Sequence, residues 1–137
     1  MNQSFWLAFA AYVLVTYALT YLWHNTTFAP RYEELGLYRD DVVYPLGEGS
    51  WLIQGLLFAW VYPHVFSTAD DQWLFSGLKF AAAFGVLALS FLVLPTAGKG
   101  KVTSVSNYLM LETAFTAIQF VITGLLIAFF YRGFNPV

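Results

Sequence analysis

Four long apolar segments constrain the fold of this chain more strongly than any other feature. The first, residues 5–23, carries no charged side chain. As a helix it would cover roughly 28 Å, close to the ~30 Å hydrocarbon core of a bilayer. Three further segments lie at about 50–66, 73–94 and 108–131. Because lipid offers no hydrogen-bond partners to an exposed backbone, segments of this kind must be helical. The sequence therefore predicts an all-α integral membrane protein with four spans.

The composition agrees with the membrane class. Only 10% of the 137 residues are charged, whereas a soluble domain carries about a quarter, and the mean hydropathy is +0.63. The net charge of −2 gives no reason to expect a nucleic-acid partner. Cysteine is absent, which excludes disulfides, thiolate metal sites and cysteine nucleophiles.

The connections between the spans predict the topology. They contain about 27, 6 and 13 residues, which favours an antiparallel four-helix bundle with residues 1–137 as a single transmembrane domain. The first and third connections share one face and hold four basic residues, against two near the other face: Arg31, Arg39, Lys99 and Lys101 against Lys79 and Arg132. Basic loops tend to stay inside, so residues 24–49 and 95–107 are expected to be cytoplasmic.

A short interfacial helix is expected between spans one and two, in the sequence PRYEEL. Pro30 suits its first turn and Gly36 its C-cap, and its apolar side would keep it in the plane of the membrane interface. No histidine or nucleophile pair accompanies its carboxylates, so a docking surface is favoured over a catalytic loop. The expected docking surface consists of Arg31, Tyr32, Glu33, Glu34, Tyr38 and Arg39.

A buried polar cluster is expected between the fourth and second spans. An ionisable group costs roughly 2.5–3.5 kcal/mol to place at the centre of a membrane helix, so Glu112 needs a reason. Gln119 lies two turns further along the same stripe, and Gln54 lies at a comparable depth in the second span. We expect Glu112 to meet Gln54 across the bundle, with Gln119 deeper. The cluster is either a clamp that sets helix register or an ion, proton or ligand site.

A second interfacial polar group, His64, Lys79 and Arg132, is expected at the opposite face. Lys79 can extend its long stem to the interface, or the group can bind a headgroup or another anion. The two histidines, His24 and His64, should be separated by most of the membrane. A shared metal or a bis-histidine haem is therefore not expected, and the sequence predicts no metal and no cofactor.

Small residues at helical spacing predict close packing of the spans. They are Gly77, Ala81 and Gly85 in the third span, and Gly124 and Ala128 in the fourth. Stripes of this kind let two helix backbones approach closely. They serve either the packing of the bundle itself or a contact with a second copy or another membrane subunit.

No catalytic motif is present: the chain lacks a Walker loop, G-x-S-x-G and H-E-x-x-H. Several short features of the chain can be compared with known families. They are Tyr32-x-x-Leu35-Gly36-x-Tyr38-Arg39, then Pro45-Leu46-Gly47, Tyr62-Pro63, and a last span with Glu112 and IQFVITGLLIAFFY. In these the chain resembles small four-span bacterial membrane proteins classed as domains of unknown function. The resemblance implies the fold and a location in the bacterial inner membrane, and it carries no activity or catalytic residue.

The expected function is that of a non-enzymatic accessory or assembly subunit of a larger membrane complex. Its partners would be membrane lipid and other membrane subunits or a second copy of itself. Two alternatives remain open. One is a small oligomeric transporter or channel with Glu112 as the coupling carboxylate, and the other is a protein that binds a lipid, quinone or pigment.

Overall fold

The structure is a computed structural model that describes residues 2–134, and all regular secondary structure in that part of the chain is helical. The helices in chain order are α1 (Gln3–Thr20), the π-helix η1 (Tyr21–Thr27), α2 (Ala29–Leu35), α3 (Tyr44–Val65), α4 (Trp73–Ala88), the π-helix η2 (Leu89–Val93), α5 (Leu94–Lys99) and α6 (Val105–Tyr131). Three continuous stretches are long and apolar enough to cross a membrane: Gln3–Thr27, Trp73–Lys99 and Val105–Tyr131. The prediction of an all-α fold is thus confirmed, and the three apolar stretches fit the prediction of an integral membrane protein.

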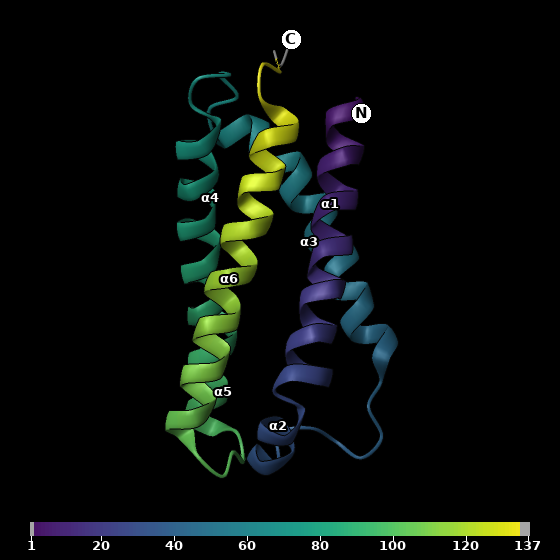
Figure 1. Cartoon of the computed structure of the whole chain (residues 1–137), viewed down its shortest axis with the longest axis vertical. Coiled ribbons are helices and arrows are strands. Elements are labelled where there is room, and N and C mark those ends of the chain that lie inside the picture. Colours follow the sequence, from purple (N-terminus) through teal and green to yellow (C-terminus); the bar gives the residue numbers. More distant parts are fainter. Residues whose placement is uncertain (1, 135–137) are drawn as a thin grey trace.

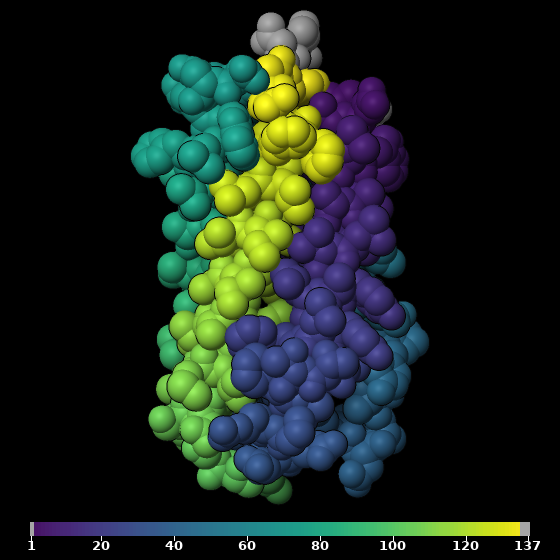
Figure 2. All heavy atoms as spheres, in the orientation of Figure 1, coloured from purple at the N-terminus to yellow at the C-terminus, as the bar shows by residue number. Residues whose placement is uncertain are grey.

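The helices lie side by side along the long axis of the molecule (Figure 1). Both ends of the described chain lie at one end of the structure, and α2 and α5 lie at the other. Helix α6 packs against both α1 and α4, while α3 packs mainly against α1. Figure 2 shows α6 filling the space between α1 and α4 on the face in view. The central position of α6 explains why it carries most of the buried polar side chains.

Helices α4 and α6 cross at their glycines. A Cβ atom added to Gly124 would lie 2.8 Å from the carbonyl oxygen of Gly77, and one added to Gly77 would lie 3.0 Å from Cβ of Ala128. Ala81 also faces Gly124, at 3.3 Å from the added Cβ. Gly85 is less crowded, because the nearest atom to its added Cβ is 3.6 Å away on Phe120. The small-residue stripes therefore serve packing within the chain.

Helix α3 begins earlier than the second predicted span. It starts at Tyr44 instead of residue 50, because Pro45 fits the first turn of a helix without loss of a hydrogen bond. Ser50 does not cap the helix; its hydroxyl donates to the Gly47 carbonyl within it, at 2.7 Å. Pro63 lies inside the last turn, and the helix continues to Val65.

The third predicted span does not end at Pro95. The π-helical turns of η2 come just before this proline, and the helical stretch continues to Lys99. A proline removes one N–H and crowds the carbonyl four residues back, and a wider turn in front of it accommodates that defect. Helix α6 likewise starts at Val105, before residue 108, because the Ser104 side chain accepts a hydrogen bond from the Asn107 amide.

The short helix after the first span is present where it is predicted. Helix α2 has Pro30 in its first turn, and Gly36 follows it with φ of 64°. Its inner side is buried against α5, η2 and α6, through Tyr32 and Leu35. The Thr103 amide and hydroxyl donate to the carbonyls of Leu35 and Glu34, at 3.2 and 2.7 Å. Helix α2 therefore packs against the bundle and is not a free surface segment.

Gly36→Ala is expected to lower the free energy of unfolding by about 1–2 kcal/mol, because a side chain at positive φ strains the backbone. Thermal unfolding followed by circular dichroism in detergent would measure the change. The control is Gly98→Ala in α5, where an added Cβ has no neighbour within 4 Å. It should be neutral, or stabilising by up to about 1 kcal/mol. Equal stability of Gly36→Ala and the unmodified chain would contradict the prediction.

Candidate functional site

The π-helix η1 brings two aromatic side chains against neighbouring elements. The Trp23 ring lies 4.4 Å from Phe28 and 5.9 Å from Phe115, between ring centroids. The His24 ring lies 4.5 Å from both Tyr32 in α2 and Phe115 in α6. A π-turn changes the direction in which later side chains point, and such turns are frequent at functional sites. His24 is thereby directed at the carboxylate-bearing face of α6.

Glu112 is held by groups from η1 and α2. The Tyr32 hydroxyl donates to Oε1 of Glu112 at 2.5 Å, and Nε2 of His24 lies 3.1 Å from the same oxygen. The indole N–H of Trp23 donates to the Tyr32 oxygen at 3.1 Å. Only 11% of the His24 side chain and 12% of the Glu112 side chain are exposed. We call Trp23, His24, Tyr32 and Glu112 the Glu112 cluster.

The hydrogen bonds of His24 restrict where protons lie in this cluster. Nδ1 lies 3.3 Å from the Thr20 carbonyl oxygen, which can only accept, so Nδ1 carries a hydrogen. Nε2 then either donates to a Glu112 carboxylate or accepts from a protonated Glu112. In both arrangements the His24–Glu112 pair holds two protons in total, and they differ only in whether the shared proton lies on Nε2 or on the carboxyl group. Because Oε1 also accepts from Tyr32, the first arrangement, an imidazolium–carboxylate pair, fits the geometry better.

Tyr32 acts as a fixed donor to Glu112. Burial, followed by the neighbouring Glu112 carboxyl, raises the pKa of Tyr32 far above its ordinary value. The hydroxyl therefore keeps its proton at neutral pH. This corrects the expectation that Tyr32 belongs to an exposed docking surface, because its side chain is 1% exposed and points at α6.

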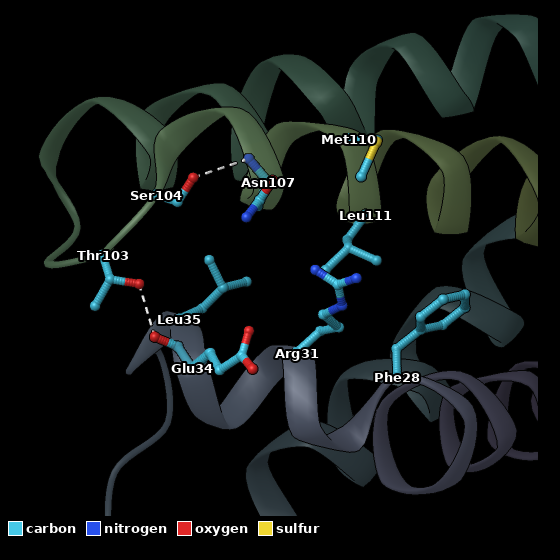
Figure 3. A pocket seen from close by; sticks show the side chains of 9 residues that line it. All are labelled: Phe28, Arg31, Glu34, Leu35, Thr103, Ser104, Asn107, Met110 and Leu111. Carbon is cyan, nitrogen blue, oxygen red and sulfur yellow. Dashed lines mark hydrogen bonds between the residues drawn. The ribbon is translucent and has the colours of Figure 1, made fainter.

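The other members of the predicted docking surface are exposed: Arg31, Glu33, Glu34, Tyr38 and Arg39. Arg39 makes a two-point ion pair with Asp41, at 2.9 and 2.8 Å. Figure 3 shows Arg31 and Glu34 of α2 on the side of the helix that faces the start of α6. They line a small cavity of about 150 Å³ between the two helices. Arg31, Glu33 and Glu34 are thus exposed charged side chains of α2, whereas Tyr32 and Leu35 anchor the helix.

Gln54 and Gln119 belong to a different network from Glu112. The Tyr12 hydroxyl donates to Oε1 of Gln54 at 2.6 Å, and the Gln119 amide donates to the Thr16 hydroxyl at 3.3 Å. No hydrogen bond joins Glu112 to Gln54 among residues 2–134. The expected meeting of these two side chains is therefore wrong. Glu112 is bonded to His24 of η1 and Tyr32 of α2 instead. Gln54 faces α1, the helix on which α3 packs.

An open pocket lies beside the Glu112 cluster, and we call it the interfacial pocket. It has a volume of about 590 Å³ and lies between η1 with the end of α1, the 36–43 segment and the first turns of α3. Five aromatic side chains line it: Tyr17, Tyr21, Tyr38, Tyr44 and Trp51. His24 contributes to its wall, so the pocket and the Glu112 cluster share one residue.

The aromatic side chains that line the pocket also pack against one another and against the Glu112 cluster. Tyr17 and Trp51 pack edge to face across α1 and α3, with ring centroids 6.1 Å apart. Tyr38 stacks on Tyr32 of the Glu112 cluster, at 5.8 Å and 23° between the ring planes. Sequence reasoning missed this site because Tyr17, Tyr38 and Trp51 lie on three separate stretches of an aromatic-rich chain. Only the packing of α3 beside α1 brings them together.

The second interfacial polar group is not one cluster. His64 bonds to the Trp60 carbonyl at 2.7 Å, and Lys79 lies 4.3 Å above the Phe75 ring. Arg132 lies over the Phe129 ring at 4.3 Å and 3.8 Å from the Asp70 carboxylate. Each of the three thus engages a different neighbour. In residues 2–134 there is also no group of three or more histidines and carboxylates placed to hold a metal ion.

Comparisons of this sequence with protein-family models, with curated proteins and with solved structures found no match. The functional evidence is therefore carried by the cavities and polar clusters of the chain itself.

Proposed function

We propose that this integral membrane protein binds an amphipathic small molecule in the interfacial pocket and catalyses no covalent reaction. The observation that carries the proposal is the pocket itself, about 590 Å³ in volume and lined by five aromatic rings and two valines, with Thr20, His24, Asn25 and Glu48 as further polar residues. Ligand sites in proteins are typically clefts of about 300–1,000 Å³ with apolar walls and a few polar groups. The pocket has both properties.

The proposed placement in the membrane has four spans, with α3 as the fourth and α2 in the interface plane. Helix α3 has 22 residues, which corresponds to about 33 Å, and it packs along α1. Its first turns carry Glu48 and line the pocket together with the exposed 36–43 segment, so the pocket would open at the membrane surface. We place residues 24–49 and 95–107 in the cytoplasm of a bacterial cell. A C-terminal reporter that is active only in the cytoplasm should then be inactive.

The absence of catalysis is supported by the hydrogen bonds of His24. Thr20 and Glu112 occupy both ring nitrogens, so neither is free to accept a proton from a substrate. Within residues 2–134, no serine or threonine hydroxyl is bonded to a histidine ring. A nucleophile paired with a base would require such a bond.

The test uses two glycines of α3. Gly47 lines the pocket, and Gly49 does not; an added Cβ has no neighbour within 4 Å at either position. Two residues along a helix are about 200° apart, so Gly47→Phe fills the pocket while Gly49→Phe points away from it. Three probes would be tested with protein in lipid nanodiscs: tetraphenylphosphonium, triphenylphosphine oxide and tetraphenylborate. Equilibrium dialysis measures binding above that of empty nanodiscs.

The proposal expects at least one of these probes to bind saturably. That affinity should fall by at least about tenfold in Gly47→Phe, because the ring occupies the site, and change little in Gly49→Phe. If none of the three binds, or if both variants bind like the unmodified protein, the interfacial pocket is not a ligand site.

An accessory role in a larger membrane complex is a second candidate. The exposed charged side chains of α2, Arg31, Glu33 and Glu34, favour it, because no ion pair within residues 2–134 uses them. Gentle extraction from the native membrane should then recover the protein together with other subunits. Recovery only as a lone monomer would count against this role.

A further inference from the structure

We infer that the ligand of the interfacial pocket is a lipophilic organic cation, such as a quaternary ammonium or phosphonium compound. This inference rests on the proposed ligand-binding function and adds the charge of the ligand. It is supported by the charges that line the pocket, by the aromatic rings and by the state of His24.

The charge that lines the pocket is negative. Glu48 lines it, and no lysine or arginine is among the lining residues of the part of the chain that the structure describes. Segment 23–48 as a whole holds five carboxylates and two guanidinium groups, a net charge of −3. Arg39, the basic residue in the 36–43 segment, is neutralised by its two-point pair with Asp41. An anionic ligand would meet unfavourable potential here, and a cation would be attracted.

The aromatic rings provide the short-range recognition of a cation. The faces of Trp and Tyr rings attract a cation within about 6 Å, and this is how quaternary ammonium ligands are commonly bound. Rings come from three separate segments: Tyr17 and Tyr21 from the first helical stretch, Tyr38 from the connection, and Tyr44 and Trp51 from α3. A ligand in the pocket would therefore contact rings on more than one side.

His24 does not oppose a cation in this pocket. Its Nε2 is 3.1 Å from Oε1 of Glu112, so a positive charge on the imidazole is compensated by the carboxylate behind it. The Thr20 carbonyl oxygen at Nδ1 adds a further negative dipole. The wall that His24 contributes is therefore close to neutral as seen from the pocket.

The ligand must also be lipophilic. Val42 and Val43 line the pocket and are 44% and 47% exposed, so apolar surface continues out of it. At a membrane interface a charged head can lie in the pocket while an apolar part rests in lipid. Small hydrated cations such as Na⁺ would gain little from such walls, because they need oxygen ligands.

The test compares ligand charge. Tetraphenylphosphonium and tetraphenylborate have the same tetraphenyl shape and opposite charges, and triphenylphosphine oxide is a smaller neutral relative. Tetraphenylphosphonium should bind at least about tenfold more tightly than triphenylphosphine oxide, which is neutral, and tetraphenylborate should bind more weakly still. Glu48→Gln should weaken tetraphenylphosphonium binding about fivefold, as expected for loss of an exposed ion pair. Glu33→Gln removes another exposed carboxylate that does not line the pocket and should change the affinity less than twofold. Trp51→Leu should weaken binding about tenfold through loss of the ring.

The outcomes separate this inference from the proposed function. The neutral or the anionic probe could bind at least as tightly as the cation and lose that binding in Gly47→Phe. This result would overturn the inference about charge, while the proposed ligand-binding function would stand. Unchanged tetraphenylphosphonium affinity in both Glu48→Gln and Trp51→Leu would also overturn it. If none of the three probes binds, the interfacial pocket is not a ligand site.

A quaternary ammonium group could come from a choline lipid headgroup or from a free cation. Both fit the same chemistry, and nanodisc composition distinguishes them. If phosphatidylcholine nanodiscs reduce tetraphenylphosphonium binding relative to neutral ethanolamine-lipid nanodiscs, the headgroup occupies the pocket. If binding is equal in the two lipids, the ligand is a free lipophilic cation.

Discussion

Glu112→Leu is expected to lower the free energy of unfolding by about 3–5 kcal/mol, the typical loss when one partner of a buried pair is removed. The reason is that the Tyr32 hydroxyl and Nε2 of His24 both lose their shared acceptor, Oε1. Chemical unfolding of the purified protein in detergent, followed by circular dichroism, measures the loss. The control is Glu33→Leu on the exposed side of α2, which should change stability by less than about 0.5 kcal/mol.

Glu112→Gln distinguishes the two roles that the carboxylate can have. The amide keeps one acceptor oxygen and removes the charge, so we expect an intermediate loss of about 1.5–3 kcal/mol. A structural clamp predicts that stability falls while tetraphenylphosphonium binding per folded molecule is kept. Normal stability with lost binding or lost transport in liposomes would show that Glu112 is a coupling group and would contradict the clamp.

The second large effect is expected at the crossing of α4 and α6. Gly124→Ala should cost about 2–3 kcal/mol, because the new Cβ would lie 2.8 Å from the Gly77 carbonyl oxygen and 3.1 Å from Phe80. Backbone atoms cannot yield as the end of a flexible side chain can, so the two helices must separate. The same unfolding measurement applies.

Gly85→Ala is the matched control on the facing helix. Its added Cβ meets Phe120 at 3.6 Å, an ordinary van der Waals distance. The substitution should be neutral to within about 0.5 kcal/mol, or slightly stabilising. A destabilisation as large as that of Gly124→Ala would mean that the close approach at Gly77 and Gly124 is not what limits the packing of α4 on α6.

Local chemistry predicted α2 well because every signal for it lies within a few residues. Pro30 sets the first turn, and Gly36 supplies the positive φ that ends the helix. The limits of α3 and α6 were less well predicted. Pro45 and Ser104 are the residues that start these helices, and several nearby polar residues are equally plausible starts in the sequence.

The candidate site was predicted only in part. Glu112 stands out in the sequence because a carboxyl group in an apolar span is costly. Its partners do not stand out, since His24 and Tyr32 reach it through a π-turn and a docked helix. A π-turn has poor local energetics and persists only where distant contacts support it. In this chain those contacts include the packing of Trp23 and His24 on Phe115.

The sequence by itself determined the membrane class, the helical content and the need to explain Glu112, because these follow from the cost of burying charge and bare backbone in lipid. Tertiary structure alone decided which side chains hold Glu112, that Gln54 pairs with Tyr12, and that five aromatic rings surround one pocket. The physical reason is that these features depend on how η1, α2 and α3 lie against α1 and α6. Residues far apart in the chain set that packing together, and no local pattern encodes it.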